Sequence, residues 1–229
     1  MRLSIIIPCY NEAATVGALI DRVRDLDIDK ELIVVNDGSS DGSREALKRF
    51  EGIPGIHVHH NPVNLGKGAS VRIGFSLAKG DIVTIQDADL ELDPSEFLRL
   101  IAPIENGETD VVYGSRFLLP LPPGQRGNLM FYAANRGLST LASVMFGQKI
   151  TDLETCYKLI RREVLEKLNL KAARFEIEPE ITAQLCKRGV KILEMPIGYR
   201  PRTSAEGKKL SWRDGYGAVM KLIDERMKP

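Results

Sequence analysis

Short runs of apolar residues alternate with amphipathic segments along the first half of the chain. The apolar runs predict strands at Leu3–Ile7, Leu32–Val35, Ile56–His60, Ile82–Ile85 and Asp110–Gly114. Helical periodicity between them predicts helices over Ala14–Leu26, Asp41–Phe50 and Lys67–Leu77. Strands that lack polar alternation are typical of parallel sheets covered on both faces. Strands and helices in this order indicate right-handed crossovers and an α/β fold.

The second half of the chain begins with a segment that its composition marks as a loop. Leu118–Gly127 holds three prolines and two glycines, and we expect it to be mobile and close to the functional site. The pattern after it predicts helices over Asn128–Phe146, Arg162–Leu168, Pro179–Arg188 and Ser211–Met227, and strands at Tyr157–Ile160 and Lys191–Pro196. No linker long enough to separate autonomous domains interrupts this pattern.

Length and composition narrow the class of protein. With 229 residues, 43% hydrophobic and 28% charged, the chain is predicted to be one globular domain. Its 32 basic residues nearly balance 31 acidic ones, which argues against nucleic-acid binding. No apolar stretch reaches the ~18 residues that a membrane span needs, and no secretory signal is recognised. The cysteines, Cys9, Cys156 and Cys186, lack metal or disulfide spacing, so we expect a cytoplasmic protein.

The strongest candidate for chemistry is the acidic segment QDADLE, which directly follows the strand Ile82–Ile85. Ligands of open α/β sheets bind at the carboxyl ends of strands. In an extended chain Asp87 and Asp89 would share a face, with Glu91 next in phase. Such a set suits Mg²⁺ or Mn²⁺, completed by substrate phosphates. The alternative is an acidic turn that caps a helix beginning near Pro94.

Three further segments at the ends of predicted strands or helices are candidates for ligand binding. VNDGSSDG ends a buried strand, and its Asp37 suits a nucleobase or ribose contact, whereas Ser40 and Asp41 suit helix capping. PCYNE follows the first strand without the GxGxxG turn of a dinucleotide-binding fold. NLGKG opens a helix and offers N–H groups and Lys67 to an anion, but it lacks the spacing of a P-loop.

The four segments in this order, IPCYNE, VNDGSSDGS, NLGKGAS and the DAD strand end, resemble the family 2 inverting glycosyltransferases of the GT-A fold. The resemblance is closest to dolichyl- or polyprenyl-phosphate sugar synthases, and it extends from Leu3 to about Arg202. It implies a single GT-A domain with a mostly parallel sheet and helices on both faces. Within it, residues 1–116 would form the nucleotide-sugar half, 117–210 the acceptor half, and 211–229 an amphipathic helix.

The resemblance also implies roles for individual residues. Those expected to bind the nucleotide-sugar donor are Pro8, Tyr10, Glu12, Asp37, Lys67, Asp87, Arg200 and Arg202. Asp87, Asp89 and Glu91 would hold the metal, Mg²⁺ or Mn²⁺, on the donor diphosphate. Arg116 would face the donor or the acceptor phosphate. For Arg200 and Arg202 the alternative is solvated surface charge in a basic loop, which would continue through Glu206 to Lys209.

The acceptor segment TDLETCYK departs from the pattern of polyprenyl-phosphate enzymes, in which an Asp is followed by Ser/Thr-Gly-Phe-Arg. Here Cys156 replaces the glycine and Glu154 is added. A phosphate acceptor is already anionic and needs cations, whereas a hydroxyl acceptor needs a carboxylate base. Asp152 and Glu154 are the candidates for that base. Alternatively, one caps the turn and the other pairs with Lys158 or Arg161.

These inferences predict a metal-dependent enzyme that moves a sugar, with inversion, from a UDP- or GDP-linked donor to a polyprenyl phosphate. A second hypothesis replaces the lipid phosphate with a sugar hydroxyl, and a third is a nucleotide-sugar-binding protein without turnover. The apolar stripes of Asn128–Phe146 and Ser211–Met227 suit packing against the domain or contact with a membrane surface. We therefore expect a cytoplasmic location, with a peripheral position at the cytoplasmic face of the membrane as the alternative.

Overall fold

The computed structural model describes residues 1–119, 129–202 and 212–228, and the sheet organises all of them. Seven strands lie in the order β3-β2-β1-β4-β6-β5-β7. Their bounds are β1 Leu3–Cys9, β2 Lys30–Asn36, β3 Ile56–His60, β4 Ile82–Ile85, β5 Val111–Ser115, β6 Lys158–Arg161 and β7 Ile192–Pro196. Strand β6 is antiparallel to both of its neighbours, β4 and β5, whereas the other pairs are parallel.

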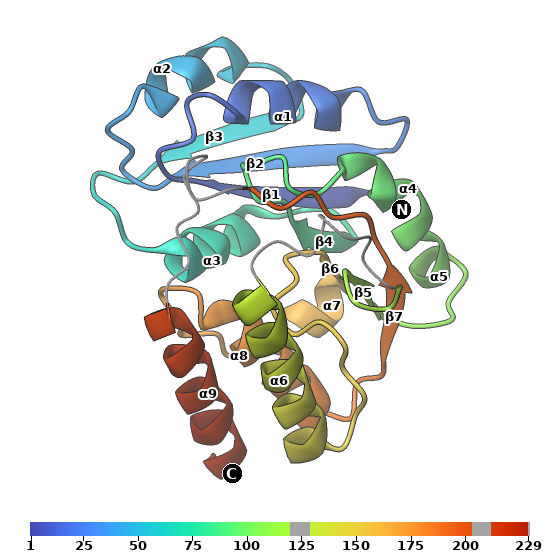
Figure 1. The fold of residues 1–229 in the computed structure, drawn as a ribbon. Helices are drawn as coiled ribbons and strands as arrows, with labels where there is room; N and C mark the ends of the chain where they lie inside the picture. The colour runs from blue at the N-terminus through green and yellow to red at the C-terminus, as the bar shows by residue number, and fades with distance from the viewer. Residues whose placement is uncertain (120–128, 203–211, 229) are drawn as a thin grey trace.

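The helices cover both faces of the sheet, as the resemblance implied. Figure 1 shows α1 and α2 on one face of the β1–β2–β3 region and α3 on the other. The bounds are α1 Val16–Arg24, α2 Ser43–Leu47, α3 Lys67–Leu77, α4 Phe97–Leu100, α5 Ala102–Glu105, α6 Leu129–Phe146, α7 Arg162–Leu165, α8 Ile177–Lys187 and α9 Trp212–Met227. Short 3₁₀ turns occupy Lys48–Phe50 and Pro94–Glu96.

The predicted elements are confirmed, with small shifts at their ends. The helix predicted over Asp41–Phe50 divides into α2 and a 3₁₀ turn. The helix predicted to begin at Pro179 begins at Ile177 instead, since a proline is tolerated within the first helical turn. Most of the loop predicted at Leu118–Gly127 lies outside the described residues.

The direction of the strands brings the candidate segments to one edge. Strands β1, β2, β4, β5 and β7 all run the same way, so their carboxyl ends share that edge. Because β6 runs the opposite way, the residues that precede it, Thr151–Tyr157, meet the same edge. The topology therefore gathers the acidic segment after β4, the turn after β2 and the acceptor segment before β6.

Two helices extend the molecule beyond this edge. Figure 1 shows α6 and α9 side by side, projecting away from the sheet, with α8 behind them. The core beneath them is continuous with the sheet through Leu138 and Ala142 of α6 and Leu222 of α9, which are buried. Across the described part of the chain, no helix combines the length and the apolar character that crossing a bilayer requires.

Candidate functional site

A cavity of about 830 Å³ opens at the carboxyl edge of the sheet and continues between α6 and α9. It brings together most of the residues that the sequence singled out. Its walls include Pro8, Tyr10, Glu12, Asp37, Lys67, Asp87, Asp89, Glu91, Arg116, Glu154 and Arg202. Asp152 and Arg200 are not among the residues that line it.

Asp37 lines the cavity, and its carboxylate also holds the backbone that forms the neighbouring part of the wall. Its oxygens accept hydrogen bonds from the Leu65 and Gly66 backbone N–H groups, at 2.9 and 2.8 Å, and from Asn61 Nδ2 at 2.8 Å. Gly66 has a φ of +97°, and a Cβ there would lie 2.4 Å from the Ala173 carbonyl oxygen. Asp37 and Gly66 thus fix the turn that leads into α3.

A chain of alternating charges runs from the cavity wall at the sheet edge into the core. The Lys67 Nζ lies 2.8 Å from Asp87 Oδ1 and 3.4 Å from Glu178 Oε1. Glu178 Oε2 lies 2.6 Å from the Nζ of Lys158, and both of these side chains are buried. Burial alone would lower the pKa of Lys67, but Asp87 and Glu178 raise it far above its usual range. Burial likewise opposes ionisation of Asp87, yet Lys67 holds its pKa below the usual value.

Glu178 and Lys158 were not predicted as site residues. The sequence does carry a signal for Lys158, because it is a charged residue inside the apolar run that predicts a buried strand. Such a residue is almost never fully buried without a partner. Its partner Glu178 opens α8 some 20 positions later, a distance at which sequence pattern predicts no contact.

The carboxylates after β4 do not follow the extended alternation that the sequence suggested. β4 ends at Ile85, and Leu90 adopts a φ of +60°, so the segment turns instead of continuing as a strand. Asp87 therefore faces Lys67, whereas Asp89 and Glu91 face Arg202. The extended geometry predicted for this segment is therefore wrong, although all three carboxylates line the same cavity.

Arg202 is the cation at the centre of the second acidic group. Its guanidinium lies 3.1 Å from Glu12 Oε2, 3.0 Å from Asp89 Oδ2 and 3.6 Å from Glu91 Oε1. Burial and the neighbouring carboxylates of Asp87 and Glu91 raise the pKa of Asp89 to about 7. One arginine is thus shared by three acidic side chains, so acidic groups outnumber basic ones at this end of the cavity.

The carboxylates fit a divalent cation that the substrate completes, but not a preformed protein cage. No group of three or more potential ligands is arranged around a metal position in the described ranges. Asp87 and Asp89 nevertheless line the cavity, with side chains 31% and 18% exposed. Mg²⁺ typically takes one or two carboxylates and fills its other positions with water and phosphate oxygens. The donor set therefore suits Mg²⁺ or Mn²⁺ only together with a phosphate ligand.

Asp152 pairs with Arg116 in a closed, two-point geometry. Arg116 donates from Nε to Asp152 Oδ2 and from Nη2 to Oδ1, both at 2.7 Å, and its backbone N–H donates to Oδ2 at 2.9 Å. Asp152 is fully buried and lies outside the cavity wall, so the structure does not place it where a general base would reach an acceptor proton. The pKa of Arg116 would be lowered by burial, but Asp152 raises it, which keeps the guanidinium charged at the cavity wall.

Glu154, the second predicted base, lies in the cavity wall. Its Oε1 is buried and has no hydrogen-bond partner among the described residues. Burial, reinforced by Glu178 and opposed by Lys158, Arg116 and Lys67, raises its pKa to about 7. The neighbouring Cys156 is a buried thiol whose pKa is raised by burial, which agrees with a packing role and not with a nucleophile.

The two arginines predicted after β7 have different environments. Arg202 enters the cavity, but the Arg200 side chain is exposed and is not part of the wall. Within the described ranges, the hydrogen bond of Arg200 runs from its backbone N–H to the Glu91 carbonyl at 2.9 Å. The structure therefore does not place Arg200 in the donor site as predicted. The continuation of this loop, including Glu206 and Gly207, lies outside the described residues.

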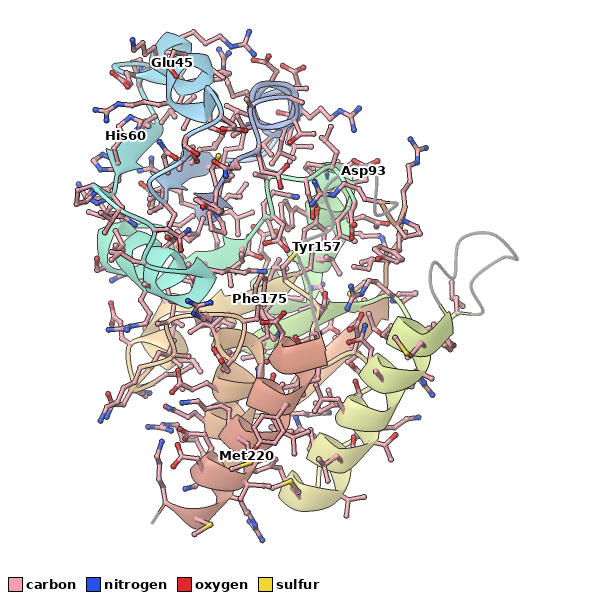
Figure 2. All side chains as sticks on the ribbon, turned by 60° about the vertical axis from the view of Figure 1, so that its left-hand side comes forward. Glu45, His60, Asp93, Tyr157, Phe175 and Met220 are labelled. Atoms are coloured by element: carbon pink, nitrogen blue, oxygen red, sulfur yellow. The ribbon has the colours of Figure 1, made fainter. Side chains whose placement is uncertain are left out.

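The far end of the cavity is formed by the paired helices and is mostly apolar, with Asn135 and Asp214 as the polar wall residues. The wall residues on α6 are Met130, Ala134, Asn135, Gly137, Leu138 and Leu141, and those on α9 are Asp214, Gly215 and Val219. Figure 2 shows Tyr157 and Phe175 near the middle of the molecule, and Met220 farther along α9. Large apolar side chains also remain on the outer surface of both helices: Val144 is 78% exposed, Tyr216 65% and Met227 80%. A charged half and an apolar half thus meet in one cavity.

Comparison with known proteins places this architecture among sugar-transferring enzymes. An undecaprenyl-phosphate mannosyltransferase of Micrococcus luteus is 29% identical over 220 residues, which cover 91% of this chain and 87% of the relative. A dolichol-phosphate mannosyltransferase of Pyrococcus furiosus is 30% identical over 91% of this chain, but the match covers 59% of that longer relative. A polyprenol monophosphomannose synthase of Mycolicibacterium smegmatis is 29% identical, with 88% and 78% covered.

Solved structures show the same fold. A glucosyl-3-phosphoglycerate synthase from Mycobacterium tuberculosis, crystallised with Mn²⁺ and UDP-glucose, superposes with a TM-score of 0.77 at 22% identity. The match covers 100% of this chain and 80% of that one, and it confirms the predicted GT-A fold. The family model named Glycosyl transferase family 2 matches residues 4–169. This range includes the carboxyl ends of β1, β2, β4 and β5, but not β7. The chain therefore belongs to glycosyl transferase family 2.

Proposed function

We propose that this glycosyltransferase moves a sugar, with inversion, from a nucleotide-diphosphate sugar to a polyprenyl phosphate. One observation carries the proposal: a single cavity has carboxylates and cations at the sheet edge and an apolar passage between α6 and α9. A lipid phosphate matches these two parts of the cavity, because it has an anionic head and an apolar tail. The names of the relatives from Micrococcus luteus and Pyrococcus furiosus support the same class of acceptor.

The donor would occupy the charged half of the cavity. As the sugar leaves, negative charge grows on the nucleoside diphosphate, and cations placed beforehand stabilise that charge. Asp89, with Asp87 beside it, would hold Mg²⁺ or Mn²⁺, which supplies Lewis-acid stabilisation of the diphosphate. Lys67 and Arg202 are charged and already in the wall. Tyr10, Pro8 and Asp37 at the ends of β1 and β2 would contact the nucleoside of a UDP- or GDP-linked donor.

The acceptor phosphate would lie near Arg116. A phosphate needs no base, because it is anionic at neutral pH, but it does need a fixed cation. Asp152 holds Arg116 by two parallel hydrogen bonds and so orients it without touching the acceptor. The tail would then follow the apolar wall of α6 and α9 toward the outer ends of these helices. Their exposed apolar side chains suit contact with lipid, so we propose a peripheral position at the cytoplasmic face of the membrane.

The acceptor assignment predicts a selective effect of filling the apolar passage. Gly137 of α6 lines the cavity, and a Cβ added there meets nothing within 4 Å. A Gly137→Trp variant should raise the KM for undecaprenyl phosphate about 10-fold or more, about 1.4 kcal/mol, because the indole would occupy space in the passage that the lipid tail needs. Transfer to the short farnesyl phosphate should change less than about threefold, because its shorter tail occupies less of the passage. Initial rates with labelled UDP- and GDP-sugars measure both.

Ala133→Trp is the matched control, since Ala133 is exposed on the same helix and does not line the cavity. Equal losses with both lipids in Gly137→Trp would contradict the passage. A product formed only with a sugar alcohol or oligosaccharide would instead support the second hypothesis, a hydroxyl acceptor with Glu154 as base. That hypothesis has one observation in its favour, the carboxyl of Glu154 in the cavity wall. Failure of every nucleotide sugar to bind would favour a protein without turnover.

A further inference from the structure

The segment from Thr151 to Thr155 is held from several sides. The Thr151 and Asp152 backbone N–H groups donate to Glu194 Oε1 at 2.8 and 3.2 Å. The Thr151 hydroxyl bonds to Ser115 Oγ at 2.6 Å. The Asp152 carboxylate is taken by Arg116. The start of the segment is therefore fixed to both β5 and β7.

A buried lysine fixes the second part of the same segment. The Nζ of Lys158 donates to the carbonyl oxygens of Leu153, at 2.9 Å, and of Thr155. These carbonyls belong to the residues on either side of Glu154. The Nζ of Lys158 also donates to Glu178 Oε2, at 2.6 Å. Ordering this network costs conformational entropy. Its effect is to hold the backbone on both sides of Glu154 in one conformation.

Glu154 differs from its neighbours in this segment. Its Oε1 is buried, yet no hydrogen bond to it is made within the described ranges, and the side chain lines the cavity. A buried polar atom without a partner lowers stability, so such an atom calls for an explanation. The surrounding backbone is rigid, and the carboxyl therefore has little freedom to turn toward another group of the protein.

The groups around Glu154 show which part of a substrate would meet it. Four charged side chains face it: Lys158 of β6, Glu178 of α8, Arg116 after β5 and Lys67 of α3. Each of them is already paired with another side chain of the protein. Lys67 is beside Asp87 on the donor side, whereas Arg116 is on the acceptor side. A group transferred between those two sides would pass in front of Glu154.

We infer that Glu154 is a hydrogen-bonding contact for a hydroxyl group of the transferred sugar. The inference rests on the proposed function, and it gives Glu154 a role in donor selection in place of the predicted role as base. A protonated carboxyl both donates and accepts, which matches a sugar hydroxyl, itself a donor and an acceptor. A site built to bind a hydroxyl discriminates against analogues that lack it, because its own polar group is then left unpaired.

The protonation of Glu154 makes the contact dependent on pH. Its pKa of about 7 lies above the ordinary value for glutamate because of burial first, and because of Glu178. Below pH 7 the carboxyl is protonated and can donate to the hydroxyl. Above pH 7 it becomes a carboxylate, which accepts but no longer donates, so the hydrogen bond that the carboxyl donates to the sugar hydroxyl is lost. Affinity for the intact nucleotide sugar should therefore fall as the pH rises from 6 to 8.

The test measures binding without any acceptor, by titration calorimetry with UDP-glucose and GDP-mannose and with the corresponding nucleoside diphosphates. For the nucleotide sugar that binds the wild-type protein, Glu154→Leu should raise Kd about 10- to 100-fold, since the sugar hydroxyl is then buried without its partner. Its Kd for the bare nucleoside diphosphate should stay within about twofold. Glu154→Gln should bind the nucleotide sugar nearly normally and lose the pH dependence.

Deoxy analogues of the bound sugar complete the test. One of them should bind the wild-type protein about as weakly as Glu154→Leu binds the intact donor, and Glu154→Leu should bind both equally. Glu163→Gln, an exposed glutamate on α7, is the control and should change nothing. Equal weakening of the bare nucleoside diphosphate would overturn the inference, as would normal donor binding in Glu154→Leu with loss of transfer alone. If neither nucleotide sugar binds the wild-type protein, the proposed function itself fails.

Discussion

Changing Asp152 to asparagine should lower the free energy of unfolding by about 3 to 5 kcal/mol, the range for removing one partner of a buried ion pair. The substitution keeps the size of the side chain, but it leaves the guanidinium of Arg116 only 13% exposed and without its counter-charge. Net stabilities of about 5 to 15 kcal/mol make this a large fraction of the total. Urea denaturation followed by circular dichroism measures the change.

A double variant separates this structural role from catalysis. Asp152→Leu combined with Arg116→Met removes both charges, and it should be less destabilising than Asp152→Asn, because no buried charge is left unpaired. Transfer should fall in both variants, since each disturbs or removes the cation that we assign to the acceptor phosphate. If Asp152→Asn unfolds like the wild-type protein, the predicted contribution of the Arg116–Asp152 pair to stability is wrong.

Replacing Asp89 with alanine should reduce the rate of transfer by about 10²- to 10³-fold, the usual loss when one group that stabilises developing charge is removed. In the structure this carboxylate contacts Arg202 at 3.0 Å and lines the cavity. Within the described ranges, its Oδ1 accepts a hydrogen bond from the Glu91 backbone N–H at 3.2 Å, whereas both Asp87 oxygens lie near the charged Lys67, so we assign the contact with the cation to Asp89. Electron paramagnetic resonance of Mn²⁺ in the presence of a nucleoside diphosphate should show weaker metal binding.

The acidic control is Asp110→Asn, which removes an exposed carboxylate paired with Arg161 and distant from the cavity wall. It should leave both the rate and the Mn²⁺ signal within about twofold, as expected for a surface ion pair. Comparable Mn²⁺ binding by Asp89→Ala and wild-type protein, with transfer intact, would show that the metal assignment is wrong. Loss of transfer with unchanged Mn²⁺ binding would direct attention to the contact with Arg202 instead.

The acceptor segment shows where prediction from sequence succeeded and where it stopped. The departure at Glu154 and Cys156 is visible in the order of residues, and it directs attention to this segment. Which carboxylate faces the substrate was not visible. Asp152 and Glu154 are two positions apart and chemically alike, yet one is closed off by Arg116 and the other lines the cavity. That difference arises from β5 and β7, which are far away in sequence.

For the motifs after β1, β2 and β4, too, the sequence predicted some features and left others undetermined. That the motifs after β1, β2 and β4 meet at one edge followed from parallel strands, and it was confirmed. The direction of each carboxylate did not follow, because an extended geometry was assumed where Leu90 takes a positive φ and the chain turns. The partnership of Lys158 with Glu178 was equally out of reach, since it joins β6 to α8 across the core.

The sequence by itself determined the strands, the helices, the α/β class and the set of segments that carry the chemistry. Those features depend on periodicity and on turn residues, which act over a few neighbouring positions. Only the tertiary structure decided which charges are paired, which carboxyl is left in the cavity wall, and that α6 and α9 continue a polar site as an apolar passage. Such features depend on contacts between distant segments, and burial then sets the strength of each charge–charge interaction.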